Sequence, residues 1–249
     1  INLFNYLKYF LMSKIKRKFY KKVSPLIGNF LDSLFLTDFS RRGLDYYHNY
    51  HENDYSFNKD EVCLIHVPRT GGGSLRFYLE KNKKFFTLNK SAQHYPVSLI
   101  CNPKEYKYVS IFRNPIDRVI SHYNMLLETK TKVASFGFSN WLKNDRFSKN
   151  LYCQYFSGHV YEDVNEQIFN SALDNIKNFF FIINFEKFEN ETKELLKKLN
   201  LDHNIEIKNY SSRIQKNFNE DISKMKILTK EYNSWDLKLF NEFINLKKK

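Results

Sequence analysis

Cysteine is scarce in this sequence, and its scarcity argues against two kinds of site. The 249 residues contain three cysteines, Cys63, Cys101 and Cys153. An odd number at these spacings fits neither a disulfide framework nor a zinc site. We therefore expect no metal cofactor and a reducing compartment. Cys63 lies in an apolar run and is interpreted as a small core residue.

Long apolar runs are also missing. The first 12 residues are largely apolar, but Lys8 interrupts them and a basic run follows. Because a membrane-spanning helix needs about 20 apolar residues, we expect no span within this sequence. The segment has no small-residue cleavage site, which disfavours a signal peptide. Since residue 1 is isoleucine, a true start at Met12 and a missing upstream anchor both stay open.

Acidic residues are absent from positions 1–31, which carry seven lysines and arginines. Without these and the three lysines at 247–249, the net charge falls from +13 to +3. Basic ends of this kind favour a polyanion or an anionic membrane surface, but they are equally typical of a solvated, poorly ordered end. We predict a basic N-terminal helix and linker over 1–60 and one globular domain over 61–249.

The pattern of apolar residues predicts an α/β fold with a parallel sheet. Short buried strands are expected over 62–67, 106–112 and 179–185, because each is a nearly continuous apolar run. Helical spacing follows each of them, with Asn114 and Pro115 as a helix start. A last helical pattern covers 232–246. Strands that alternate with helices are typical of parallel α/β sheets.

Glycine is rare too, with seven residues in all, yet Gly71, Gly72 and Gly73 are consecutive. They lie between an expected strand and an expected helix. Such a turn offers backbone N–H groups and the positive end of the helix dipole, and glycine lets a ligand approach closely. The loop is therefore interpreted as an anion site, most often a phosphate site. Arg69, Thr70 and Ser74 would add a charge and two hydroxyl donors.

The usual phosphate loops do not fit this sequence. A P-loop NTPase needs lysine after the last glycine, where this chain has Ser74. The G-x-G-x-x-G pattern of dinucleotide-binding folds is absent as well. ATP and NAD are therefore both disfavoured as ligands.

Two segments resemble the nucleotide motifs of carbohydrate sulfotransferases. The stretch His66–Leu75, HVPRTGGGSL, resembles their 5′-phosphosulfate loop, and Tyr108–Pro115, YVSIFRNP, followed by DR and SHY, resembles their 3′-phosphate motif. The closest pattern belongs to the branch of heparan sulfate 2-O- and 6-O-sulfotransferases and their bacterial relatives. Later stretches, Asn209–Ser212 and Asp236–Phe240, look like the family's late Asn-x-Ser loop and final helix. The resemblance covers about residues 61–245.

The resemblance implies a P-loop-like three-layer fold, with a central parallel sheet flanked by helices, that binds 3′-phosphoadenosine 5′-phosphosulfate (PAPS) as co-substrate. Arg113 and Ser121 would bind the 3′-phosphate; a guanidinium at a strand's carboxyl end independently suits a phosphate. The full set of cofactor-binding residues expected is Arg69, Thr70, Gly71, Gly72, Gly73, Ser74, Leu75, Arg113, Ser121 and Ser212.

The expected reaction is an in-line attack of an acceptor hydroxyl on sulfur. Charge grows on the leaving phosphate, so donors fixed around it should carry much of the acceleration. The family usually has lysine at position 69; Arg69 keeps the charge but cannot readily give up a proton, so we assign it an electrostatic role. His94 is our candidate base, because the branch places a catalytic histidine between the two motifs. We interpret His66 as orienting the loop and His122 as part of the core pattern.

The resemblance favours a carbohydrate acceptor, whether polysaccharide, oligosaccharide or glycolipid, and we expect no nucleic-acid partner. Two alternatives stay open: a P-loop-like nucleotide kinase or phosphotransferase, and a non-catalytic module that binds polyanions through the basic ends. We expect a cytoplasmic protein, peripheral at an anionic membrane if the basic N-terminal segment binds lipid. An upstream anchor missing from the sequence would instead imply the Golgi lumen.

Overall fold

The computed structural model describes residues 62–81, 85–86, 103–129, 137–145, 148–159, 163–203 and 221–248. All of them belong to one unit of the chain, residues 54–249. The expected N-terminal segment over 1–60 lies outside the described residues, and so do His94 and Ser212. Within the described part, no helix combines the length and the apolar character that crossing a membrane requires.

A parallel sheet forms the centre of this unit. Its strands follow the order β2 (Phe85–Phe86), β1 (Val62–Ile65), β3 (Lys107–Phe112) and β4 (Phe181–Asn184), and every neighbouring pair is parallel. The three strands expected from the sequence are present with slightly shorter bounds. The two-residue β2 was not expected, because so short a segment leaves no periodic pattern.

Helices follow the strands, which confirms the α/β class. After β1 comes α5 (Gly72–Lys81), and after β3 come α6 (Pro115–Glu128), α7 (Phe138–Asn144), α8 (Leu151–Ser157) and α9 (Glu166–Lys177). After β4 come a short 3₁₀ turn η4 (Phe185–Lys187), α10 (Phe188–Lys198), α11 (Ile222–Tyr232) and α12 (Ser234–Leu246).

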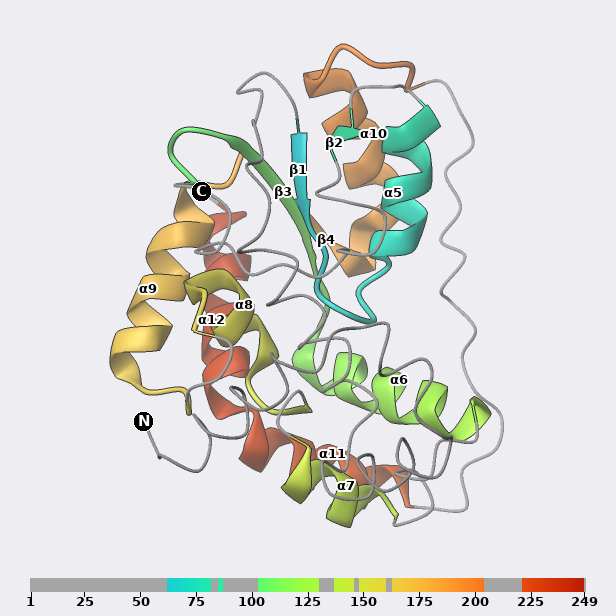
Figure 1. Ribbon diagram of the computed structural model, residues 1–249, viewed down its shortest axis with the longest axis vertical. Helices are drawn as coiled ribbons and strands as arrows, with labels where there is room; N and C mark the ends of the chain where they lie inside the picture. Colours follow the sequence, from blue (N-terminus) through green and yellow to red (C-terminus); the bar gives the residue numbers. More distant parts are fainter. Residues whose placement is uncertain are drawn as a thin grey trace, which may run out of the picture. The chain divides into compact units, whose positions relative to one another are not determined.

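Alternate side chains of β3 face opposite sides of the sheet. Val109 and Ile111 join a buried cluster with leucines of α5 and α10. On the other side, the Phe112 ring packs against aromatic rings of α8 and α12, with centroids 4.2 Å from Tyr152 and 5.1 Å from Phe243. Helices therefore cover both faces, with α5 and α10 on one side and α8 and α12 on the other (Figure 1). This explains why the strands are apolar throughout.

The C-terminal helix expected over 232–246 is present as α12, which begins two residues later, at Ser234. A further helix, α11, ends at Tyr232 and was not expected. Asn233 lies between them, where its side-chain amide donates to the Thr229 carbonyl and its amide oxygen accepts from the Asn150 backbone N–H. These side-chain hydrogen bonds compete with a continuous helix.

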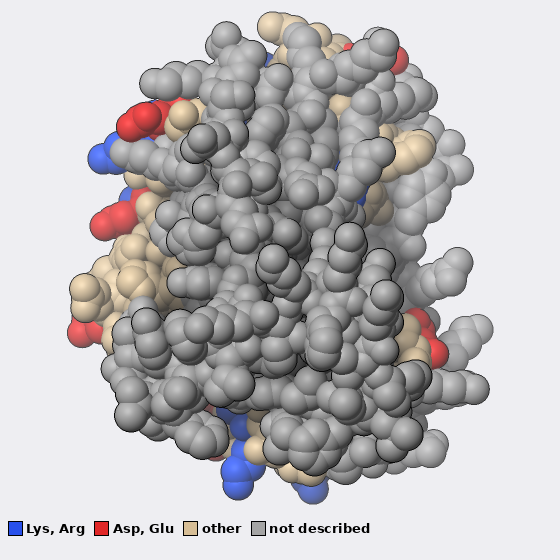
Figure 2. Space-filling view, in the orientation of Figure 1, with Lys and Arg blue, Asp and Glu red and all other residues tan. Residues whose placement is uncertain are grey.

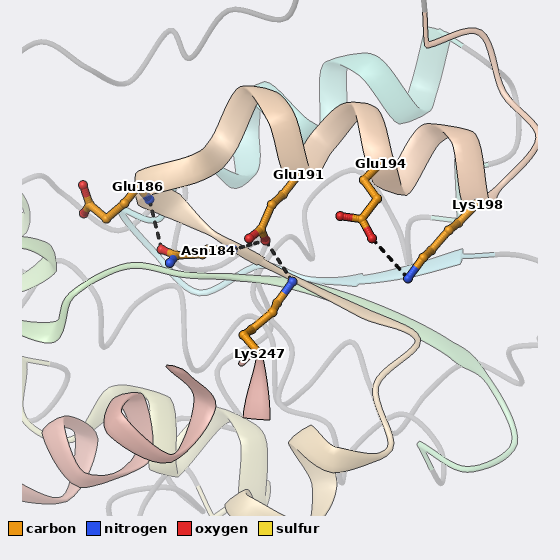
Figure 3. A network of polar contacts seen from close by, with 6 residues as sticks. All are labelled: Asn184, Glu186, Glu191, Glu194, Lys198 and Lys247. Carbon is orange, nitrogen blue, oxygen red and sulfur yellow. Dashed lines mark hydrogen bonds and ion pairs between the residues drawn. The ribbon is translucent and has the colours of Figure 1, made fainter. Parts of the chain in front are cut away.

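Lys247 is fastened to the fold, although the sequence placed it in a basic end. Its ammonium lies 2.9 Å from Glu191 of α10 and over the ring of Phe181, 4.4 Å from the centroid. Glu191 also accepts the Asn184 backbone N–H at 2.7 Å, so one carboxylate joins β4, α10 and the end of α12 (Figure 3). At least this lysine is therefore not a freely solvated charge.

The described surface mixes both signs of charge. In the face shown in Figure 2, acidic and basic side chains lie close together at the left edge. Exposed ion pairs of the described helices include Lys177 with Asp174 at 3.1 Å and Lys198 with Glu194 at 3.3 Å. Pairs this exposed contribute little to stability.

The start of α6 provides a test of the local fold. The Asn114 side chain accepts the Ile116 N–H at 2.9 Å and so caps the helix that follows β3. We expect Asn114→Ala to lower the free energy of unfolding by about 1 kcal/mol. The matched control is Asn170→Ala, at an exposed position inside α9, which should leave stability equal or slightly higher. Equal losses for both variants in denaturant unfolding would contradict the capping role.

Candidate functional site

The glycine loop connects β1 to α5 as a tight turn. The Thr70 hydroxyl donates to the Val67 carbonyl at 2.8 Å, and the Ser74 and Leu75 N–H groups bond to the Gly71 carbonyl at 3.0 and 3.2 Å. Thr70 and Ser74, both expected to bind phosphate, are buried, and the Thr70 hydroxyl is engaged in closing the turn. The N–H groups of Gly72 and Gly73, the first two residues of α5, have no preceding turn of the helix to bind, which is the property that suits a helix start to anions.

Two of the three glycines are required by the backbone or by packing. Gly71 has φ +87°, a conformation that other residues adopt with strain. A Cβ at Gly72 would lie 2.1 Å from the His66 ring, so that ring and the helix start occupy adjoining space. At Gly73 a Cβ would meet nothing within 4 Å. His66 therefore packs directly against the loop it was expected to orient.

The loop, the end of β3 and α6 come together through two arginines. The Arg113 guanidinium donates from Nη1 to the Arg69 carbonyl at 3.2 Å. The Arg69 guanidinium in turn lies 3.3 Å from the Ser121 hydroxyl through both Nε and Nη2. Three residues that the sequence assigned to one ligand thus lie in contact, although 52 positions separate Arg69 from Ser121.

Arg69 itself has an unusual backbone. Its φ is +70°, in the left-handed region, and it is one of three non-glycine residues there among those that the structure describes. Backbone strain of this kind persists only where the surrounding structure holds it and is frequent at functional sites. Here it directs the Arg69 carbonyl to Arg113 while the side chain reaches α6.

The site concentrates positive charge in a partly buried place. Burial lowers the pKa of the Arg69 guanidinium, and the adjacent Arg113 lowers it further, whereas Glu128 acts in the opposite direction. Burial likewise lowers the pKa of Arg113, opposed by Tyr152 and nearby acidic groups. Guanidinium groups keep their proton despite such shifts. Two like charges at close quarters would be stabilised by an anion between or beside them.

Arg113 also has unused hydrogen-bonding capacity. Its Nε is buried and finds no hydrogen-bond partner among the described residues. The guanidinium carbon lies over the Phe185 ring, 4.5 Å from the centroid, which fixes the plane of the group. A buried donor without a partner is costly, so this nitrogen is suited to a ligand oxygen.

Sequence reasoning missed two residues around Arg113. The Tyr152 hydroxyl bonds to both the N–H and the carbonyl of Arg113, at 3.0 Å each. Phe185 comes directly after β4 and contacts both Arg113 and the Gly71 position. Both aromatic side chains look like ordinary core residues in the sequence, and no local motif marks them.

The remaining candidates fall in three groups. His94 and Ser212 lie outside the described residues, so the expected base and the late serine are not located. His122 is buried on α6, edge-on to Trp141 at 5.4 Å, as its core pattern predicted. His159, which no sequence motif surrounds, is exposed after α8.

Neither a scan against protein-family models nor a search of curated proteins finds a match to this chain.

The glycines offer an internally controlled test. We expect Gly72→Ala to lower the free energy of unfolding by about 1–3 kcal/mol, because the new methyl group must displace the His66 ring. Gly73→Ala, one residue further into α5, should raise it by about 0.5–1 kcal/mol, because alanine favours a helix and meets open space. Chemical unfolding of both variants checks this; a Gly72→Ala protein as stable as the Gly73→Ala protein would rule out the packed geometry.

Proposed function

We propose that this protein is a sulfotransferase that moves a sulfuryl group from PAPS to a hydroxyl of a carbohydrate, on a P-loop-like fold. One observation carries the proposal: the glycine loop, Arg113 and Ser121 meet at one partly buried, doubly positive place. PAPS carries a 3′-phosphate and a 5′-phosphosulfate on one ribose, and two adjoining anion-binding elements suit such a ligand. Helices on both faces of the parallel sheet are consistent with the fold proposed.

Arg113 and Ser121 are the proposed ligands of the 3′-phosphate. Arg113 lies just beyond the carboxyl end of β3, the edge at which open α/β sheets bind ligands. Its unpartnered Nε would donate to a phosphate oxygen. Ser121 lies two turns into α6 and now accepts from Arg69, a contact that a bound phosphate would replace or share.

The loop is the proposed site of the 5′-phosphosulfate. In the transfer, the acceptor oxygen forms a bond to sulfur while the bond from sulfur to the 5′-phosphate oxygen breaks. The electron pair of that bond leaves with 3′-phosphoadenosine 5′-phosphate (PAP). The backbone N–H groups at the start of α5 and the Arg69 guanidinium would stabilise the growing charge. His94 is the proposed base that takes the acceptor proton.

A kinase function is weaker on chemical grounds. Ser74 occupies the place where a P-loop NTPase needs its lysine. Arg69 instead precedes the glycines, and its guanidinium contacts Ser121 of α6. A terminal phosphate and its magnesium ion are not the ligand that this arrangement favours.

Binding of the product nucleotide tests the proposal. By calorimetry, we expect wild-type protein to bind PAP more tightly than ATP with magnesium, and Arg113→Ala to weaken PAP binding about 100-fold, because a buried charge-assisted contact is lost. Lys197→Ala on α10 removes one positive charge from an exposed position and is the matched control. It should bind PAP as the wild type does.

The alternatives give different results in the same experiment. Tight binding of ATP with magnesium in place of PAP would favour a kinase. PAP binding that survives Arg113→Ala but disappears when residues 1–31 and 247–249 are deleted would favour a polyanion-binding module. No PAP binding by well-folded wild-type protein would refute the sulfotransferase.

A further inference from the structure

Arg113 lies in the short connection between strand β3 and helix α6. Residues 113 and 114 fall between the last residue of β3 and the first residue of α6. A sheet ladder therefore does not fix the Arg113 backbone, and neither does a helix. The Tyr152 hydroxyl holds this backbone instead, because it accepts the Arg113 N–H at 3.0 Å and donates to the Arg113 carbonyl at 3.0 Å.

The Tyr152 hydroxyl can both accept and donate a hydrogen bond because it is neutral and buried. Its side chain is fully buried, with its ring 4.2 Å from that of Phe112. Burial raises the pKa of Tyr152 well above its ordinary value, so the hydroxyl keeps its proton throughout the working pH range. A protonated phenol is both donor and acceptor, whereas phenylalanine at the same place would be neither.

Tyr152 is in turn held by Asp236 from the far end of the sequence. The two carboxylate oxygens of Asp236 accept the backbone N–H groups of Tyr152 and Cys153 at 2.9 and 2.8 Å, at the start of α8. Asn150, which precedes α8, caps α12 in the same way. Its side-chain oxygen accepts the Trp235 and Asp236 N–H groups at the start of α12. The two helices thus cap each other's first turns.

A second buried arginine supports this arrangement. Arg118 of α6 is fully buried and donates to the Ser148 carbonyl at 3.3 Å, with its guanidinium 5.9 Å from the Tyr152 ring centroid. Burial raises the pKa of Asp236, whereas the N–H groups it accepts and the charge of Arg118 lower it. The buried charge of Arg118 thus favours the ionised form of a fully buried carboxylate.

We propose that Tyr152 is a positioning residue for Arg113, and that Asp236 acts through Tyr152 to set the Arg113 guanidinium against the loop. The chain of contacts runs from Asp236 to the Tyr152 backbone, from the Tyr152 hydroxyl to the Arg113 backbone, and from the Arg113 side chain to the Arg69 carbonyl. This inference rests on the proposed function, in which Arg113 binds the 3′-phosphate.

The test compares PAP with AMP, which lacks the 3′-phosphate. Tyr152→Phe should weaken PAP binding about ten-fold and change AMP binding less than two-fold, because two hydrogen bonds to the Arg113 backbone disappear while the ring stays. Tyr155→Phe is the matched control, since Tyr155 is also a buried tyrosine of α8. A merely structural role would lower the affinity for both nucleotides alike.

Double variants then test the order of the contacts. In an Arg113→Ala background, Tyr152→Phe should change PAP affinity less than two-fold, because no charged side chain is left at position 113 to be positioned. Asp236→Asn should lower the ratio of PAP to AMP affinity in the wild type but not in the Tyr152→Phe protein. Independent, additive losses in these cycles would overturn the proposal.

The outcomes separate this inference from the proposed function. Wild-type protein that does not bind PAP refutes both. Wild-type protein that binds PAP, with Tyr152→Phe keeping the wild-type ratio of PAP to AMP affinity, refutes the positioning role alone. If Tyr152→Phe does not fold, hydrogen exchange of the wild-type protein decides: a protected Arg113 amide supports the contact with Tyr152, and a rapidly exchanging one overturns it.

Discussion

Two hydrogen-bonding groups hold Arg113 from opposite sides, and the arrangement of the candidate site depends on them. The Arg69 carbonyl accepts a hydrogen bond from the Arg113 guanidinium. The Tyr152 hydroxyl accepts from the Arg113 backbone N–H and donates to the Arg113 carbonyl. The residue itself lies in a two-residue gap between strand and helix. Without these two contacts, the Phe185 ring would be left to orient the charge at the end of β3.

The cost of this arrangement is the proximity of like charges. Burial lowers the pKa of both guanidinium groups, and the charge of Arg113 lowers the pKa of Arg69 further. A fold tolerates such a cost where packing over-determines the geometry. Here the left-handed backbone of Arg69, the Phe185 ring beneath Arg113 and the shared start of α8 and α12 supply that support.

The sequence predicted the elements that carry local patterns. The three apolar strands, the Asn114 cap and the helices after the strands were all readable, since each depends on neighbouring residues. The family resemblance assigned Arg69 and Ser121 to opposite ends of one nucleotide, but the direct contact between their side chains was not predicted. The roles of Tyr152 and Asp236 were not readable, because a buried tyrosine and a distant aspartate acquire them only through contacts across 39 and 84 positions. The start of α12 after Asn233 was not readable either, since that residue is held by Asn150.

A structure of the protein with PAP bound would locate the nucleotide against the two arginines and the glycine loop. The 3′-phosphate is expected within hydrogen-bonding distance of the Arg113 guanidinium and the Ser121 hydroxyl, and the 5′-phosphate against the N–H groups at the start of α5. A nucleotide bound in the reverse orientation, or away from the glycine loop, would show that these residues do not form a PAPS site.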